Sequence, residues 1–264
     1  MSRATFGAQL REWRLALGFS QLELAARADV SQRHVSFLET GRSRPSREMV
    51  IHLGHVLDVP PREQNLLLLA AGHAPAFSET PLDELGHIAG VVDLILEAHE
   101  PNIAIVVDRQ WSLIRANRAA TVFMSTLFPE PPTWAAPPLN VMRLNFHPDG
   151  MRRHMVGWES AAAALLRRLE RDVASHPHDR SLRDLLEEVR SYPSVDTLPR
   201  QIPKAGAADL LVPATYMIDG DEVSLFTTIA IIGDAHDLTL AELRLETFWP
   251  ADPLSAERWK RLFV

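Results

Sequence analysis

Two short helices joined by a tight turn are the feature that most restricts how this chain can fold. Ser20 precedes the first helix, and Glu23 lies three residues further on, which is the spacing of a capping box. Ser31 is a second N-cap, and the helix that it starts is predicted to end near Thr40, before a glycine. Ala25 lies where the two helices must pack closely. The segment therefore predicts a compact pair of helices rather than strands or one long helix.

Helical spacing on both sides of this pair predicts five helices within residues 1–72. Apolar residues recur at helical spacing from Phe6 to Leu17, and Gly18 ends that segment. Ser46 caps a fourth helix, and a proline pair starts a fifth, which ends at Gly72. The first 72 residues are thus predicted to form an all-α domain.

The remainder of the chain changes character after a linker. Residues 73–81 follow Gly72, carry a serine, a threonine and two prolines, and are predicted to connect two domains. Helical periodicity over residues 82–98 then gives way to a period of two, which predicts a hairpin and later strands. The predicted strands are residues 103–107, 111–114, 210–218, 222–232 and 239–249, with helices at 160–174 and 181–191 between the second and third strands. Residues 82–264 are therefore predicted to be an α+β domain with an antiparallel sheet.

The charge is divided unevenly between these two parts. The chain of 264 residues has a net charge of −7, but residues 1–72 hold nine arginines against seven acidic residues. The first part is therefore +2 and the rest −9. This division fits a module that approaches a polyanion, joined to one that avoids phosphate.

Composition also excludes several classes of site and location. The chain has no cysteine, which excludes disulfides, thiolate metal sites and iron–sulfur clusters. No apolar run approaches the roughly 18–20 residues of a membrane helix. The first residues lack the apolar stretch of a secretory signal, so we expect a cytoplasmic protein without a membrane partner.

The third helix, residues 31–40, has a polar outward face. With Val35 and Leu38 turned inward, its exposed positions are Gln32, Arg33, Ser36 and Phe37. Residues 19–26 and 30–42 resemble the helix-turn-helix of the lambda-repressor/Cro-type, or XRE, family, over about residues 5–70. Asp29 stands where that family usually has a turn glycine, and Asp tolerates the left-handed conformation better than most residues.

The resemblance implies that this helix enters the major groove of operator DNA. Arg33 would then fork onto guanine, Gln32 would pair with adenine, and Phe37 would touch a thymine methyl group. Gln21 matches the family's phosphate-contacting position at a helix N-terminus. Further contacts are expected from His34 and Ser36 on the helix and, to phosphates, from Arg42 and Arg44.

Two alternatives apply to this helical part. The outward residues are also compatible with a solvated polar face, and some members of the fold mainly mediate protein contacts. Proteins that read DNA in this way usually bind as two-fold dimers, because one half-site gives too little specificity. We therefore expect a homodimer.

The second part resembles the MmyB-like regulator ligand-binding domain. The resemblance rests on seven segments in colinear order over about residues 90–253: residues 108–111, 116–120, 140–144, 146–148, 157–159, 225–229 and 240–252. It implies a PAS-like domain with a pocket for a fatty acid or a similar amphipathic carboxylate. Gly157 departs from the asparagine that the family often has there.

Such a ligand needs an apolar tunnel and a polar anchor. Arg143, in an otherwise apolar stretch, is the expected partner of the carboxylate, with Asn117 or Asn140 as hydrogen-bond donors. Arg143 is equally compatible with a pair to Glu159 or Glu246, and each asparagine with a helix cap. The expected apolar or wall-lining residues are Phe123, Met142, Trp158, Phe226 and Thr228.

No sequence pattern predicts an enzyme, a cofactor or a metal centre. Glycine-rich phosphate loops, HExxH and GxSxG are absent. Residues 147–149 and 176–179 include metal-ligand residue types, but their prolines argue against a coordinated set. The sequence therefore predicts a DNA-binding regulator controlled by a small ligand. The alternative is a constitutive regulator whose second domain serves dimerisation or protein interaction.

Overall fold

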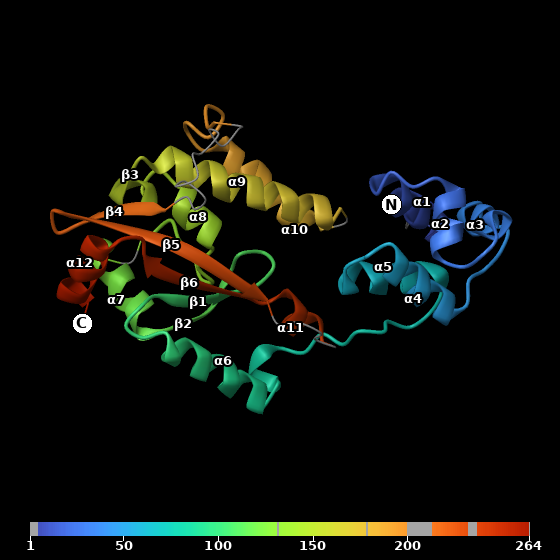
Figure 1. The fold of residues 1–264 in the computed structure, drawn as a ribbon, viewed down its shortest axis with the longest axis horizontal. Helices are drawn as coiled ribbons and strands as arrows, with labels where there is room; N and C mark the ends of the chain where they lie inside the picture. Colours follow the sequence, from blue (N-terminus) through green and yellow to red (C-terminus); the bar gives the residue numbers. More distant parts are fainter. Residues whose placement is uncertain (1–4, 131, 178, 200–212, 232–236, 264) are drawn as a thin grey trace. The chain divides into compact units, whose positions relative to one another are not determined.

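The computed structural model describes residues 5–130, 132–177, 179–199, 213–231 and 237–263. These residues form two compact units (Figure 1). The first comprises residues up to Glu79 together with Asp237 and Leu238, and the second comprises the remainder. Among the described helices, none is both long enough and apolar enough to cross a membrane.

The first unit contains the five predicted helices. They are α1 (Phe6–Ala16), α2 (Gln21–Arg27), α3 (Gln32–Glu39), α4 (Arg47–Val56) and α5 (Pro61–Ala71). The hydroxyls of Thr5, Ser20, Ser31 and Ser46 each accept a hydrogen bond from a backbone N–H in the first turn of the following helix. Local capping chemistry therefore sets where α1 to α4 begin.

The five helices close over one apolar core. Its fully buried residues include Leu10, Leu24, Val35, Leu53 and Leu68. The start of α1 lies directly against the end of α3, since a Cβ at Gly7 would be 2.4 Å from the carbonyl oxygen of Glu39. Only glycine permits this close approach of the two backbones.

The second unit is built on an antiparallel sheet of six strands in the order β2-β1-β6-β5-β4-β3. The strands are β1 (Ala104–Val107), β2 (Leu113–Ala116), β3 (Met155–Val156), β4 (Ala214–Ile218), β5 (Asp221–Ile231) and β6 (Arg244–Pro250). The helices are α6 (His87–Ala98), α7 (Arg118–Leu127), α8 (Val141–Phe146), α9 (Trp158–Ser175), α10 (Arg180–Ser191), α11 (Leu238–Glu242) and α12 (Pro253–Phe263), with 3-10 turns η1 (Leu82–Glu84) and η2 (Met151–His154). A helical part followed by a part with an antiparallel sheet confirms the predicted fold class.

The two faces of this sheet have different neighbours. Alternate residues of a strand point to opposite faces. Ile105 and Phe248 face α7, α8 and α9, whereas Val106 and Leu245 face α6. Figure 1 shows α9 and α6 on opposite sides of the sheet. The helices inserted between β2 and β4 therefore cover one face, and the helix that precedes the sheet covers the other.

The structure corrects two of the predicted elements. Residues 239–242 belong to the short helix α11 rather than to a strand, because Leu240 and Leu243 are both buried at a spacing of three. The predicted helix at residues 82–98 is interrupted at Gly86, whose φ of +57° lies outside the helical region, so that η1 and α6 are separate. Residues 210–212 and 232 of the predicted strands, and His178 of the segment 176–179, lie outside the described residues.

Candidate functional site

Helix α3 presents its polar side to the exterior of the first unit. Val35 and Leu38 are buried in the core, as the spacing predicts. We call the outward set the reading face, and it consists of Gln32, Arg33, His34, Ser36 and Phe37. Gln32 and Arg33 are exposed at the N-terminal end of α3, and the other three are half-buried. The structure thus brings the predicted base-reading residues together on one side of one helix.

Phe37 organises the arginines around the reading face. The guanidinium of Arg33 lies 5.1 Å from the centroid of the Phe37 ring, and that of Arg42 lies 5.9 Å from it. Cations favour this position over an aromatic ring. The exposed Arg42 and Arg44 follow α3 in the loop before α4, so both remain available to an anion beside the reading face.

The turn between α2 and α3 has the conformation that the sequence predicts. Asp29 adopts a φ of +52°, in the left-handed region where the resembled family usually has glycine. The backbone N–H of Val30 donates to the carbonyl of Ala25 at 3.0 Å and closes the turn. An aspartate therefore replaces the glycine without a change of turn.

A buried ion pair ties α3 to the rest of the first unit. Nε and Nη2 of Arg14 donate to the two carboxylate oxygens of Glu39, at 2.6 and 3.1 Å, and the amide of Gln21 donates to the same carboxylate at 2.8 Å. Burial alone would raise the pKa of Glu39, but these hydrogen bonds outweigh it and hold that pKa below its usual value. Gln21 is therefore half-buried, with its amide turned to Glu39, while its backbone remains at the start of α2.

The second unit encloses a cavity of about 350 Å³ between the sheet and helices α7, α8 and α9. Its walls are mainly apolar. Phe123 and Phe226, both expected from the sequence, line it, as do Ile105, Leu144, Met155 and Phe248. The volume and lining are those of a small-molecule site.

Three charged residues also line the cavity. We call them the polar end, and they are Arg168 and Arg171 from α9 and Glu246 from β6. Glu246 is only 3% exposed, and its Oε1 atom has no hydrogen-bond partner among the described residues. Burial raises the pKa of Glu246 to about 7, and burial lowers the pKa of Arg168. Tyr216 also lines the cavity, and burial raises its pKa.

Arg143 does not belong to this polar end. Its Nε and Nη2 atoms donate to Glu188 of α10, each at 2.8 Å, on the surface of the unit. The hydroxyl of Tyr192 donates to the same carboxylate at 2.8 Å. Arg143 is not among the residues that line the cavity. Arg143 therefore pairs with Glu188, which lies 45 residues further along the chain. It pairs with neither Glu159 nor Glu246, the two partners considered from the sequence.

Both asparagines proposed as donors are helix caps. Asn117 precedes α7, where its Oδ1 atom accepts from the N–H of Ala120 at 3.0 Å and from that of Ala104 at 3.1 Å. Asn140 precedes α8 and accepts from the N–H of Met142 and of Arg143, both at 3.1 Å. Each asparagine therefore caps a helix, which is the alternative role considered from the sequence.

The three other expected wall residues do not line the cavity. Met142 is fully buried in the core, and Trp158 donates from Nε1 to the carbonyl of Asn145 at 3.0 Å. Thr228 shares a hydrogen bond with Thr247, at 2.5 Å between the two hydroxyl oxygens. Met142 and Trp158 are buried, whereas Thr228 is exposed.

Sequence reasoning missed the charged residues of the polar end. Glu246 interrupts an apolar strand between Leu245 and Phe248, which is the signal that was available. Arg168 carried no such signal, because it follows Arg167 on an ordinary amphipathic helix. Its position at the cavity depends on how α9 packs on the sheet.

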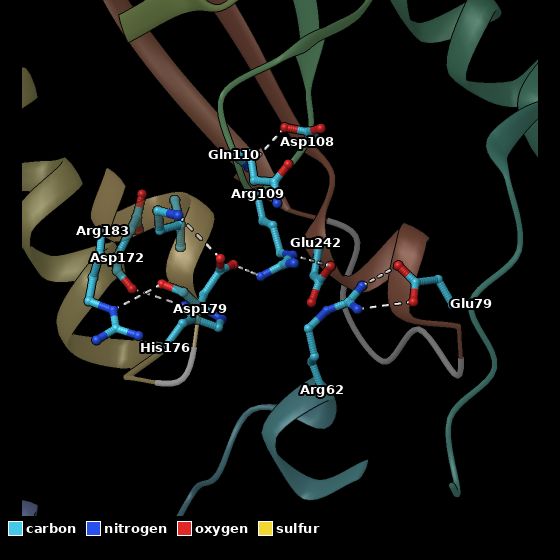
Figure 2. A network of polar contacts seen from close by, with 11 residues as sticks. Arg62, Glu79, Asp108, Arg109, Gln110, Asp172, His176, Asp179, Arg183 and Glu242 are labelled. Atoms are coloured by element: carbon cyan, nitrogen blue, oxygen red, sulfur yellow. Dashed lines mark hydrogen bonds and ion pairs between the residues drawn. The ribbon is translucent and has the colours of Figure 1, made fainter. Parts of the chain in front are cut away.

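The segment of residues 108–111, which carries part of the second resemblance, has a structural role. Arg109 extends from the β1–β2 turn to ion pairs with Asp179 and, at 3.3 Å, with Glu242 (Figure 2). Trp111 is fully buried and donates from Nε1 to Asp172 at 3.0 Å. Arg244 donates to the same oxygen of Asp172 at 2.7 Å. These contacts fix the hairpin against α9, α10 and α11, and satisfy the charges next to the polar end.

Comparison with known families agrees with this geometry. Residues 10–64 match the Helix-turn-helix family. The matched stretch contains the whole of α2, the turn that follows it, and α3. Together with the reading face, this match defines the class: the chain is a DNA-binding transcription regulator.

The chain belongs to the family of MmyB-like transcription regulators. Residues 89–262 match the MmyB-like transcription regulator ligand binding domain, and this stretch contains all the residues that line the cavity. Both resemblances drawn from the sequence are confirmed. A comparison with curated proteins found no relative that matches the chain.

Proposed function

We propose that this chain is a one-component regulator in which α3 reads operator DNA and a fatty-acid-like carboxylate in the cavity controls DNA affinity. The observation that carries the proposal is the combination within one chain of an exposed polar reading helix and an apolar cavity ended by an arginine. The family match supports both halves at a coarser level.

On the DNA side, the exposed end of α3 supplies the base contacts. Arg33 binds guanine through two donors and Gln32 pairs with adenine, while the edge of Phe37 meets a thymine methyl group. His34 and Ser36 contact the adjacent backbone or base edges. The start of α2 at Gln21, together with Arg42 and Arg44, binds phosphates and fixes the register. Two copies bind two half-sites, since a single helix of this size gives too little specificity.

On the ligand side, Arg168 rather than Arg143 binds the carboxylate of the ligand. Arg168 lines the cavity, and among the described residues no acid forms an ion pair with it. Phe123 and Phe226 contact the acyl chain in a PAS-like arrangement of helices on one sheet face. Asn117, Asn140, Met142, Trp158 and Thr228 hold the walls in place.

Control of DNA affinity requires that the ligand bind two arrangements of the regulator unequally. A ligand with equal affinity for both would shift nothing, however tightly it bound. Occupancy of the cavity changes how α8 and α9 pack on the sheet, and this difference is what the DNA-reading dimer responds to.

The test is mass spectrometry of lipids released on denaturation of the purified full-length chain, followed by titration of the delipidated protein with octanoate, dodecanoate and hexadecanoate. Bound lipid or saturable binding is expected for the wild type and for Arg143→Met, and loss of binding for Arg168→Met. A protein that carries no lipid and ignores all three acids would contradict the sensing half of the proposal. Selection of duplexes from a random pool tests the other half, and failure to enrich any sequence would contradict it.

A specific observation also favours a second function for the second unit. Helix α6 exposes Val91, Leu94 and Ile95 on one side, with Leu94 64% exposed. An apolar helix face of this kind is typical of an association surface. A constitutive dimer would show operator affinity that is unchanged by every acid, and dissociation when Leu94 is replaced by Glu.

A further inference from the structure

Glu246 is a buried acid with one carboxylate oxygen that no described residue satisfies. It lies in the central strand β6, opposite Ile105 of β1 and Ile229 of β5, so apolar residues flank it on both sides within the sheet. Its Oε1 atom is out of contact with solvent and accepts no hydrogen bond from a described residue. A buried polar atom without a partner costs about 1–3 kcal/mol. Such an atom at a cavity wall is the kind of group that a ligand satisfies.

The charged and polar groups around Glu246 come from four elements. On α9, Arg168 and Arg171 line the same cavity, while Asp172 is engaged by Arg244 and Trp111. Arg244 lies on the same face of β6 as Glu246, two residues earlier. Tyr216 of β4 and Asn145 of α8 add neutral polar groups to the lining.

Arg244 and Arg168, whose charges both act on Glu246, therefore have different roles. Arg244 is neutralised by Asp172, at 2.7 Å between Nη1 and Oδ2. Arg168 is close enough for its charge to act on Glu246, yet the two do not form an ion pair. Among the described residues, Arg168 forms no ion pair with an acid and the Oε1 atom of Glu246 accepts no hydrogen bond, and both residues line the same cavity.

We infer that the polar end is a two-point site for a carboxylic acid headgroup, in which Arg168 binds the ligand carboxylate and Glu246, in its protonated form, donates a hydrogen bond to it. This inference rests on the function proposed above and assigns its headgroup chemistry. The proton balance is simple: the ligand enters as a carboxylate, Glu246 holds the proton, and no bond to carbon changes. Arg168 and the ligand are then neutral together, and the Oε1 atom or its neighbour gains the partner that it lacks.

The alternative protonation state is unfavourable on charge grounds. An ionised Glu246 beside a ligand carboxylate would place two anions in a buried space, and each would destabilise the ionised form of the other. The raised pKa of Glu246 is consistent with the protonated form. Ligand binding by the wild type therefore takes up a proton wherever free Glu246 is ionised.

The experiment is calorimetric titration of delipidated full-length protein with dodecanoate between about pH 6 and about pH 9, the range that brackets the Glu246 pKa of about 7. Affinity of the wild type should fall about tenfold for each pH unit above that value, since one proton accompanies each ligand. Glu246→Gln keeps the size and a hydrogen-bond donor, so its affinity should be independent of pH across the same range. Infrared difference spectra should show a protonated carboxyl band on binding to the wild type at alkaline pH and none in this variant.

Two further comparisons complete the test. Dodecanol and methyl dodecanoate, which lack the carboxylate, should bind at least tenfold more weakly than dodecanoate. Arg168→Met should abolish the preference for the acid, and Arg190→Met, which removes an exposed arginine of α10, should leave it unchanged.

The outcomes separate this inference from the function proposed above. Binding of dodecanoate with no pH dependence, or with the same pH dependence in Glu246→Gln, would overturn the role of Glu246 and leave the sensing function standing. Equal binding of the alcohol would overturn the two-point site. No binding at any pH would overturn both.

Discussion

The two units of this regulator treat buried charge in opposite ways. In the first unit, the buried carboxylate of Glu39 accepts hydrogen bonds from Arg14 and Gln21, and the core around it is closed. In the second unit, the buried carboxylate of Glu246 has an oxygen without a partner and faces a cavity of about 350 Å³. The buried carboxylate of the first unit is therefore satisfied within a packed core, whereas that of the second unit borders a cavity.

This difference follows from where each unit acts. In the function proposed above, the first unit binds DNA with an external helix face, so its interior serves only to hold α3 in position. The second unit would bind its ligand in the interior, so it must leave space and polar groups unsatisfied until that ligand is bound. An unpaired charge is a defect in the first setting and a binding group in the second.

The largest expected effect is that of breaking the buried pair in the first unit. Glu39→Ala leaves the buried Arg14 without an acidic partner, although its Nη1 atom still donates to the carbonyl of Phe19, and the free energy of unfolding should fall by about 3–5 kcal/mol. Urea unfolding of the full-length protein, followed by a probe in the first unit, measures this. The double variant Arg14→Met/Glu39→Met is the control and should recover most of the loss. A loss below about 1 kcal/mol in the single variant would mean that the pair is exposed in solution.

The corresponding effect in the second unit depends on pH. Burial raises the folded-state pKa of Glu246 from 4.5 to about 7, so the stabilisation from its protonated form is fully present below about pH 4.5 and is lost as the pH rises through 7. Relative to Glu246→Gln, the delipidated wild type should lose on the order of 3 kcal/mol of unfolding free energy across this window. Parallel stability curves for the two proteins would show that Glu246 titrates normally.

The reading face should separate specificity from affinity. Arg33→Ala should cost about 1–3 kcal/mol at one base pair and relax the preference there. Arg44→Ala should weaken all duplexes alike and reduce the salt dependence by about one ion. Anisotropy titrations on the selected duplex and on single-base variants of it, at several salt concentrations, provide both quantities. If the two variants lose the same affinity on every duplex, the assignment of Arg33 to a base is wrong.

Two alanine-to-leucine substitutions, one in each unit, compare the packing of the two interiors directly. Ala25→Leu in the closed core should destabilise the protein by about 1–3 kcal/mol, because the added carbons have no space. Ala164→Leu at the cavity wall should change stability by less than about 1 kcal/mol and weaken dodecanoate binding. Thermal unfolding and ligand titration of both variants test this, and an equal loss of stability in the two would show that the cavity is not open in solution.

Local chemistry explains which parts of the fold were predictable from the sequence. The starts of α2, α3 and α4 follow from the serine that directly precedes each helix. The turn at Asp29 follows from the tolerance of aspartate for the left-handed conformation. The short helix α11 was not predicted, because alternating apolar residues at 238–245 fit a strand as well as a helix until packing decides. The break at Gly86 depends likewise on how α6 lies against the sheet.

The polar end of the cavity was hidden for the same physical reason. The reading face could be predicted because it lies on a single helix, where spacing fixes direction. Arg143 and Arg168 look alike in sequence, but one meets Glu188 on the neighbouring helix α10 and the other meets a cavity. Tertiary packing alone distinguishes them.

The most direct test of the central claim is the affinity of the full-length regulator for its selected duplex, measured by anisotropy with the cavity empty and with dodecanoate bound. A coupled regulator should show a change of at least about fivefold in operator affinity, in either direction, which is the lower range of allosteric coupling. The change should vanish in Arg168→Met. Identical affinities for the empty and the dodecanoate-saturated wild type would contradict the claim that the open interior of one unit controls the surface of the other.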